Sequence, residues 1–335
     1  MKNKEKRTKT KKRGKALKIA ALALALLILL AAGVVWIVYT QRGTLPEEEI
    51  DTEFMQGLAA DDPSRREAND TRVMSANLLA AYESWGGSDA APRAKQFLEV
   101  LKKYQPDAVG LQEVSGQWFC LLNRNLPDGY RFVSPAATGL LSHFTAIVYN
   151  ETVLTLLDSG SIPLDKGTDT RTNRIEWAQF ERKDNGAQFL VTTTQFDRIQ
   201  EEQIDSMLPI LRSEAEQLLS FIKEKEEEYH CPVIVTGDFS AMENTAYTKD
   251  SDASEIYELL ASDLTDTKND AAFAKSGLAQ SLSEPSYDHI FFYGDGKITT
   301  FRLLSDLFMQ EMSDHYPLYA DIVLPMKASV EGTTA

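Results

Sequence analysis

The sequence predicts an α/β fold in which two mixed β-sheets pack together and are flanked by helices. Short apolar runs of strand length alternate with longer segments whose apolar residues recur at helical spacing. Turn signals join several neighbouring strand-like runs, and Asp184-Asn185-Gly186 is a strong hairpin signal. Hairpins place antiparallel pairs inside the array, whereas a doubly wound parallel sheet joins its strands through helices. The pattern therefore favours two packed sheets.

The folded region is expected to begin with a strand, a helix and a second strand. One apolar run ends at Asn77 and another ends at Glu113. Between them, residues 92–104 place apolar side chains at helical spacing until Pro106 stops the helix. Further strands are expected at 145–149, 153–157, 175–180 and 188–194.

The second half of the domain is expected to begin with a long amphipathic helix. Its apolar stripe covers about 204–222, and the charged run 223–228 is its solvated end. A strand then ends at Asp238, a short helix covers 254–260, and two or three strands follow. The Gly-Asp-Gly sequence at 294–296 predicts a hairpin turn.

The N-terminus has the pattern of a single membrane anchor. The first eighteen residues carry ten Lys or Arg and one Glu, and residues 19–39 contain no charge, which is long enough to cross a bilayer. The positive-inside rule places the N-terminus in the cytoplasm and the later domain outside. A signal peptide cleaved near Ala31-Ala32-Gly33 is the alternative. The apolar run continues to Tyr39 and ends in aromatic residues, which favours a retained anchor.

The chain is long enough, at 335 residues with 43% hydrophobic content, to bury a large core. Cys120 and Cys231 lie far apart in the sequence, which is weak support for a disulfide, so two buried thiols are expected. The expected segments are a basic cytoplasmic tail (1–18), a transmembrane anchor (19–39), an acidic, turn-rich stalk (40–70), a folded domain (71–325) and a flexible tail (326–335).

Charge limits the choice of binding partner. The basic tail contributes +9 to a formal net charge of −15, so the rest of the chain carries −24. Such a domain repels polyanions, which makes tight, salt-sensitive wrapping of nucleic acid an unfavoured function. A small phosphorylated substrate or a lipid headgroup is the expected partner, and the protein is expected to be a monomer.

Polar residues, most of them carboxylates, stand beside the apolar runs. This pattern indicates metal-dependent hydrolysis of a phosphoester. If they meet at one edge of the core, they can hold a hard cation and a phosphate. Glu113, Asn77 and Asp314 offer the oxygen ligands that Mg²⁺ or Mn²⁺ prefers, and the sequence contains no Cys/His cluster of the kind that binds zinc. Hydrolysis also needs an activated water and a stabilised leaving oxygen. Asp238 is the candidate that orients the attacking water.

His315 is the candidate proton carrier or phosphate ligand. It is one of four histidines and directly follows an acidic residue near the end of the chain. An imidazolium can bind a phosphoryl oxygen or transfer a proton when a carboxylate fixes its orientation. Asp288 is the candidate for that carboxylate.

These motifs resemble, in order, those of the endonuclease/exonuclease/phosphatase superfamily, which includes DNase I-like nucleases, sphingomyelinases and inositol polyphosphate phosphatases. They lie within 71–324, nearly the whole expected domain. The matching pieces are Ser75-Ala76-Asn77-Leu78, the run from Gln105 to Val114, Gly237-Asp238-Phe239-Ser240, Tyr287-Asp288-His289-Ile290-Phe291 and Ser313-Asp314-His315-Tyr316-Pro317.

The resemblance implies a DNase I-like four-layer α/β sandwich. It implies that Glu113 is the principal Mg²⁺ ligand, aided by Asn77 and Asp314. It also implies that Asp238 positions the nucleophilic water and that Asp288 pairs with His315 at the phosphate. Whether Asp238 or His315 takes the proton of the water stays open.

Two residues depart from the pattern of this superfamily. Gln195 stands where a histidine is common; it can donate a hydrogen bond to a phosphate oxygen but cannot act as a general acid. Ser240 stands where an asparagine is usual, and loss of one oriented donor can cost on the order of 10²-fold in rate. Arg174 and Trp177 resemble an Arg-x-x-Trp stretch of the superfamily, which makes Arg174 a candidate substrate ligand. Strand packing and a surface position explain this pair nearly as well.

The leading hypothesis is a membrane-anchored, extracytoplasmic, Mg²⁺-dependent phosphoester hydrolase that acts on a lipid or a small phosphorylated substrate. A second hypothesis is a catalytically impaired relative that binds a phosphorylated ligand or a protein at the cell surface, and the two departures favour it. A divalent-metal-dependent nuclease is the third, and the acidic domain disfavours it.

Overall fold

The computed structural model describes residues 24–34, 43–63, 66–81, 89–133, 143–164, 174–198, 204–241 and 253–326. The chain divides into two compact units, 1–44 and 45–335. In the first unit, 24–34 is helical. Of the helices that the structure describes, none combines the length and the apolar character needed to cross a bilayer. Much of the expected anchor at 19–39, and all of the basic tail at 1–18, lies outside the described residues.

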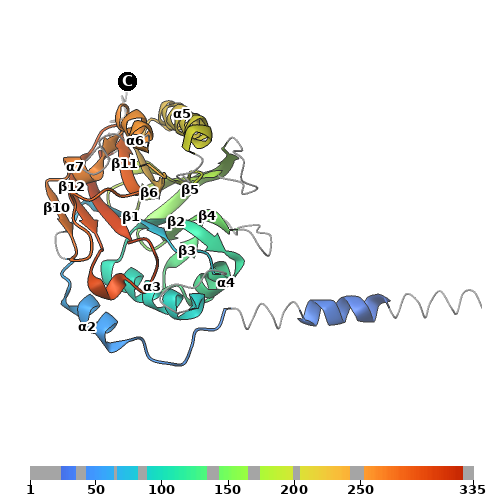
Figure 1. Ribbon diagram of the computed structural model, residues 1–335. Coiled ribbons are helices and arrows are strands. Elements are labelled where there is room, and N and C mark those ends of the chain that lie inside the picture. Colours follow the sequence, from blue (N-terminus) through green and yellow to red (C-terminus); the bar gives the residue numbers. More distant parts are fainter. Residues whose placement is uncertain are drawn as a thin grey trace, which may run out of the picture. The chain divides into compact units, whose positions relative to one another are not determined.

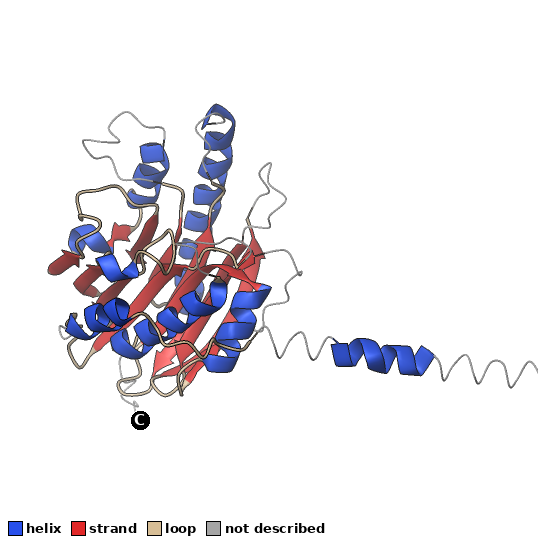
Figure 2. Cartoon of the chain, turned by 60° about the horizontal axis from the view of Figure 1, so that its bottom comes forward, coloured by secondary structure: helices blue, strands red, loops and turns tan. Residues whose placement is uncertain are grey.

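The second unit contains two mixed sheets that pack face to face (Figures 1 and 2). The larger sheet has the order β10 (Phe273–Ser276), β12 (Lys297–Leu303), β13 (Leu318–Val323), β1 (Asp70–Asn77), β2 (Ala108–Ser115), β4 (His143–Asn150) and β3 (Tyr130–Phe132). The smaller sheet has the order β5 (Leu154–Pro163), β6 (Arg174–Arg182), β7 (Gln188–Gln195), β8 (Val233–Asp238), β11 (Asp288–Tyr293) and β9 (Thr265–Asp266). Parallel pairs such as β1–β2 and β7–β8 occur beside antiparallel ones, which confirms the predicted mixed arrangement.

Helices cover the outer face of each sheet, so that the unit has four layers (Figure 1). The larger sheet packs against α2 (Thr52–Ala60), α3 (Ala90–Tyr104), α4 (Gly116–Asn125) and the short 3₁₀ helix η2 (Leu307–Met309). The smaller sheet packs against α5 (Ile204–Tyr229) and α6 (Ala253–Ala261), and the short α7 (Thr267–Asp270) follows β9. A third apolar core fills the space between the sheets.

The two sheets approach each other closely in their middle. Gly110 of β2 leaves no room for a side chain, since a Cβ there would lie 1.9 Å from Oγ1 of Thr236 in β8. Two residues further along β2, Gln112 Nε2 donates to Oγ1 of Thr193 in β7 at 2.8 Å. Glycine at 110 therefore allows β2 and β8 to approach closely in the middle of the two sheets.

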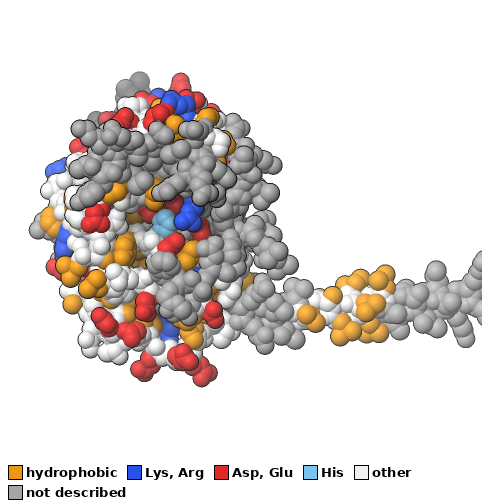
Figure 3. All heavy atoms as spheres, viewed as in Figure 1, with side chains coloured by type: hydrophobic (Ala, Val, Ile, Leu, Met, Phe, Trp, Pro, Cys, Tyr) orange, Lys and Arg blue, Asp and Glu red, His pale blue; other side chains and the backbone are white. Residues whose placement is uncertain are grey.

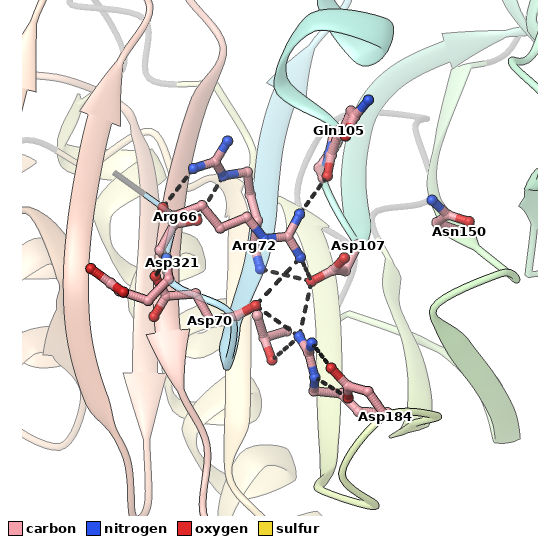
Figure 4. Close-up of polar contacts among 12 residues, drawn as sticks. Arg66, Asp70, Arg72, Gln105, Asp107, Asn150, Asp184 and Asp321 are labelled. Carbon is pink, nitrogen blue, oxygen red and sulfur yellow. Dashed lines mark hydrogen bonds and ion pairs between the residues drawn. The ribbon is translucent and has the colours of Figure 1, made fainter. Parts of the chain in front are cut away.

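A buried group of charged residues joins β1 and β13 to the start of β2, at the opposite end of β1 from Asn77 (Figure 4). The Arg72 guanidinium makes two bonds of 2.7 Å to the Asp321 carboxylate and a third, of 2.9 Å, to the carbonyl of Tyr104. Asp107 accepts from Arg66 and from the backbone amide of Arg72. Because both Arg72 and Asp321 are buried, each needs the other as a counter-charge.

The folded unit begins earlier in the chain than the sequence indicated. The expected solvated stalk at 40–70 contains α2, which starts at the side-chain cap of Asp51. Phe54 and Leu58 are only 2% and 4% exposed, because they lie one helical turn apart and pack into the core with α3 and η2. The acidic composition of this segment led to its interpretation as a solvated stalk, although it contains a short amphipathic helix.

The turn at 294–296 does not form the expected hairpin. The turn connects β11 to β12, but these strands belong to different sheets: β11 pairs with β8 and β9, whereas β12 pairs with β10 and β13. The turn therefore carries the chain from one sheet to the other. The turn around Gly186 does join a hairpin, β6–β7, as predicted, and both cysteines are buried and form no disulfide.

Candidate functional site

Strand pairing brings the predicted polar residues to one edge of both sheets. Asn77 ends β1 and pairs with the residue directly before Glu113 in β2. In the smaller sheet, Asp238 ends β8 and lies opposite both Gln195, the last residue of β7, and Asp288, the first residue of β11. Parallel strands end at a common edge, and the antiparallel β11 begins there. The register within each sheet therefore brings side chains from five strands to the same edge.

Two amide side chains connect the sheets across this edge. Asn77 Nδ2 donates to Asp238 Oδ2 at 3.1 Å, and Gln195 Nε2 donates to Glu113 Oε1 at 3.0 Å. The same nitrogens also lie 3.4 Å from Glu113 Oε1 and 3.5 Å from Asp238 Oδ2, respectively. The amides therefore neutralise part of the repulsion between two carboxylates that face each other. Figure 3 shows acidic, basic and histidine side chains close together on one face of the molecule.

Glu113 sits on an irregularity in β2. Its φ of +57° lies in the left-handed region, and the pairing with β4 shifts between Leu111 and Val114. Such bulges turn a side chain toward a site that a regular strand would not reach. Glu113 Oε2 accepts from the backbone amide of Ala80 at 3.0 Å, which fixes the second oxygen of the carboxylate.

Asn77 presents its nitrogen, and not its oxygen, to the carboxylates. Its Oδ1 accepts from the backbone amide of Leu79 at 3.1 Å, and this contact identifies the oxygen of the side chain because an N–H needs an acceptor. In this orientation Asn77 acts as a donor to Glu113 and Asp238. Its predicted role as a metal ligand through oxygen would require a different rotamer and stays a prediction.

Asp238 lies at the centre of the buried part of the site. Burial raises its pKa, the nearby His315 opposes that rise, and the carboxylates of Asp288 and Glu113 add to it, so that its pKa is about 6. Its Oδ1 accepts from the backbone amide of Ser240 at 3.1 Å. The group is therefore ionised at neutral pH but holds a proton more readily than an exposed aspartate.

His315 and Asp288 form a tight ion pair. His315 Nδ1 lies 2.6 Å from Asp288 Oδ2, while Nε2 lies 4.0 Å from both Asp238 Oδ2 and Asp314 Oδ1. Burial alone would lower the pKa of His315, but Asp288, Asp238 and Asp314 outweigh it and raise the pKa to about 10. The ring is thus an imidazolium at neutral pH, with Nδ1 held by Asp288 and the Nε2 proton directed toward the other carboxylates.

Ser240 and Arg174 are the two predicted site residues that remain to be placed. Ser240 follows Asp238 with a φ of +48°, and its side chain is buried. Arg174 begins β6; it donates from Nε to Ser161 Oγ at 2.5 Å and lies 3.6 Å from Glu176 Oε1. The described side-chain contacts of Arg174 are thus with β5 and its own strand, and its predicted contact with substrate stays a prediction.

Ser313 is a residue whose role the sequence did not reveal. Its hydroxyl donates to the backbone carbonyl of Asn77 at 2.8 Å and accepts from the amide of His315 at 3.2 Å. It therefore fastens the segment before β13 to the end of β1. A serine two residues before the histidine is the pattern of a side-chain-to-backbone turn, which was the available signal.

Comparison with known proteins shows the family to which this chain belongs. The sequence profile of the Endonuclease/Exonuclease/phosphatase family matches residues 74–315, which include every predicted site residue. The chain belongs to this family. No curated protein matches the sequence at a significant level.

Several solved structures share the fold of this chain at low sequence identity. A mannosyl-6-phosphatase from Bacteroides thetaiotaomicron is 21% identical with a TM-score of 0.60, covering 75% of this chain and 99% of that one. The catalytic domain of human Nocturnin, with a bound sulfate, is 23% identical with a TM-score of 0.56, covering 78% and 96%. The D. rerio TDP2 bound to a single-stranded DNA product is 18% identical with a TM-score of 0.55, covering 76% and 98%. These likenesses show the fold and not the substrate.

The donor set fits the divalent cation on which the family typically depends. Four carboxylates, those of Glu113, Asp238, Asp288 and Asp314, converge with a single imidazolium, so the site has an excess of negative charge. Asp238, Asp288 and His315 offer atoms within 4.8 Å of one another, the spacing of a metal cluster. A protonated imidazole has no lone pair for a metal, however, so the carboxylate side of the site is the better place for the ion.

Proposed function

We propose that this protein is a membrane-anchored, extracytoplasmic phosphoester hydrolase that uses Mg²⁺ or Mn²⁺. Endonucleases, exonucleases and phosphatases all hydrolyse phosphoester bonds, so family membership supports this class of reaction. The observation that carries the proposal is the arrangement of Asp238 beside the His315–Asp288 pair. A carboxylate that can accept a proton and an imidazolium that can donate a hydrogen bond face the same space.

Each residue then has a distinct task. Glu113, with Asp314 and Asn77 as further predicted ligands, would hold the ion, which when bound neutralises phosphate oxygens and acidifies water. Asp238 orients the attacking water and takes its proton, since the carboxylate is ionised at neutral pH while His315 already carries a proton. His315 donates from Nε2 to a phosphoryl oxygen, and Asp288 keeps the ring in that orientation.

The two non-titrating donors near the carboxylates complete the anion site. Gln195 can donate to a phosphate oxygen in place of the family's common histidine, and its charge does not change with pH. Ser240 offers a shorter hydroxyl from a backbone position next to the base. Arg174 is proposed as a more distant substrate ligand at the start of β6.

The substrate is proposed to be a lipid headgroup or a small phosphorylated molecule. The charge of −24 outside the N-terminal tail repels a polyanion at long range, and a membrane tether would bring the site close to lipid. The similar mannosyl-6-phosphatase is named for a small phosphorylated sugar, whereas the similar TDP2 holds single-stranded DNA. A salt titration of activity on DNA and on a lipid substrate separates these classes, because only DNA binding should weaken steeply with salt.

The test of the proposal is hydrolysis by the purified full-length chain. Phosphomonoesters, phosphodiesters, phospholipids and DNA are assayed with Mg²⁺, with Mn²⁺ and with a chelator, and Glu113→Ala serves as the matched inactive control. Turnover that needs the metal and is lost in the control is the expected result. No turnover above the control on any substrate would defeat the enzyme proposal.

The rival reading is a binding protein with an impaired site, favoured by Gln195 and Ser240. Calorimetric Mg²⁺ binding without turnover would support it. The topology is tested separately, by protease protection of the chain in sealed vesicles. Protection that places the domain on the cytoplasmic side would overturn the proposed localisation.

A further inference from the structure

A second histidine lies buried directly behind the catalytic carboxylates. His289 is the residue after Asp288 in β11, and it is 2% exposed. Its ring packs against Phe291, with centroids 5.2 Å apart and planes inclined by 23°, and against Phe239, with centroids 6.2 Å apart. Side chains alternate in a strand, so His289 points away from the side of the sheet to which Asp288 points.

His289 holds two loops of the site together. Its Nε2 lies 2.9 Å from the carbonyl oxygen of Ser286 and 3.1 Å from that of Ala241. A carbonyl oxygen can only accept, so Nε2 carries a hydrogen that the two carbonyls share. One loop leads into Asp288, and the other leaves Asp238.

The other ring nitrogen is anchored to the rim of the smaller sheet. His289 Nδ1 lies 3.3 Å from Asp266 Oδ2 in β9, and that oxygen accepts a hydrogen bond from Tyr257 Oη of α6 at 2.9 Å. Asn269 donates to the same phenol oxygen at 2.9 Å. A buried chain of polar contacts therefore holds the ring on the side away from the two loops.

Asp288 depends on this backbone support. Its Oδ2 binds His315, but among the residues that the structure describes its buried Oδ1 has no hydrogen-bond partner. Its amide lies 3.2 Å from Ser286 Oγ, in the residue whose carbonyl His289 holds. The placement of the carboxylate thus rests on the 286–288 segment and not on side-chain donors.

We propose that His289 is a positioning residue: it fixes the loop before Asp288 to the loop after Asp238, and so sets the alignment of the Asp288–His315 pair with Asp238. The expected catalytic consequence rests on the proposed function. The structural consequence, a fixed His315–Asp288 hydrogen bond, does not require turnover.

The test compares two variants of the full-length protein. His289→Phe keeps a ring against Phe291 but removes all three polar contacts, whereas His289→Gln keeps one amide donor for the carbonyls. With ¹⁵N-histidine labelling and no metal, the proton shared by His315 and Asp288 should give a far-downfield NMR resonance in the wild type. His289→Phe should shift or broaden it, and His289→Gln should restore it in part.

Kinetics provide the second measurement. His289→Phe should lower kcat by about 10- to 100-fold with KM little changed, the usual cost of removing a partner that orients a catalytic group, and His289→Gln should recover part of the loss. His230→Gln is the matched control, because His230 is exposed in the turn before β8 and should change neither readout.

The outcomes are separable. A folded His289→Phe protein whose His315 resonance matches the wild type would overturn the positioning role, whether or not the protein turns over any substrate. If His289→Phe does not fold, an unshifted resonance in His289→Gln, which lacks the contact with Asp266, would overturn it instead. A shifted resonance in a protein without activity would support the positioning role and defeat only the proposed function.

Discussion

At the scale of single residues, the charges around Asp238 and His315 decide which of the two groups is protonated at neutral pH. Both groups have raised pKa values, Asp238 because of burial and His315 because three carboxylates outweigh its burial. At neutral pH the proton therefore resides on the imidazole and the carboxylate is free to accept another. The site is set for a base and a hydrogen-bond donor at the same pH.

The raised pKa of Asp238 predicts a pH dependence of stability. Its pKa of about 6 lies above the ordinary 3.8, so in this window the folded state binds more protons than the unfolded state, and the contribution of Asp238 to stability falls as pH rises from about 4 to about 6. In chelator, Asp238→Asn should therefore gain on the order of 1–3 kcal/mol relative to wild type across that window. Denaturant melts at pH 4, 5, 6 and 7 measure this difference. A difference that is constant with pH would contradict the prediction.

The high pKa of His315 depends on Asp288. In the wild type the raised pKa, about 10 against the ordinary 6.5, adds stability that is fully present below 6.5 and is lost as pH rises through about 10. Asp288→Asn removes the charge that contributes most to that rise, so the pKa of His315 should drop. NMR titration of the ¹⁵N-labelled imidazole in metal-free protein measures the pKa of His315 in the wild type and in the variant. An unchanged titration would show that Asp238 and Asp314 are sufficient.

Ser240 offers a gain-of-function prediction. Its φ of +48° is a conformation that asparagine tolerates better than serine, and asparagine is the residue common in the family motif. Ser240→Asn should keep or raise the stability and should raise kcat by about tenfold, because it adds an oriented amide donor. Ser240→Ala is the control that removes the hydroxyl without adding an amide. A slower Ser240→Asn enzyme would indicate a site specialised for the hydroxyl.

At the scale of elements, the two ends of the central strands do different work. One end of β1 and β2 carries the carboxylates of the site, and the other end carries the buried Arg72–Asp321 pair. The site end has an excess of negative charge and its residues are arranged for ligands. At the opposite end Arg72 and Asp321 compensate each other's charge, and the Arg72 guanidinium also lies 4.2 Å above the ring of Tyr319.

Removing one member of the buried pair should destabilise the fold without damaging the site. Asp321→Ala leaves the guanidinium of Arg72 buried without its counter-charge, which typically costs about 3–5 kcal/mol. The double variant Arg72→Met/Asp321→Leu should lose less, because no unpaired charge is left. Chemical unfolding measures both, and kcat of the folded fraction should equal that of the wild type. Equal losses in the single and double variants would refute the pairing argument.

At the scale of the whole molecule, α2 decides where the domain begins. Residues 1–44 and 45–335 form separate units, and α2 lies in the second, with Phe54 and Leu58 in the core. Asp61, just beyond α2, also binds Arg302 of β12 at 2.9 Å. The segment before β1 is thus a structural part of the folded unit.

Truncation tests this boundary. A fragment that starts at Leu45 should melt like the corresponding part of the full chain, whereas a fragment that starts at Thr71 exposes the surface covered by Phe54 and Leu58 and should lose at least about 3 kcal/mol. Thermal and urea unfolding of the two fragments provide the comparison. Equal stability would restore the view of 45–70 as a linker.

Local patterns in the sequence were sufficient for the fold class, for most strands and helices, and for the order of the family motifs. Hydrophobic period, turn residues and motif spacing are properties of neighbouring residues, so they can be read without coordinates. The departures at Gln195 and Ser240 were visible in the same way, because each is a change of residue type within a motif.

Only the tertiary structure decided how these pieces meet. It placed α2 in the core, sent β11 and β12 to different sheets, turned the nitrogen of Asn77 toward the carboxylates and gave His315 its high pKa. Each of these depends on contacts between residues far apart in the chain. Burial and charge at a point in space are sums over such contacts, and no local pattern contains them.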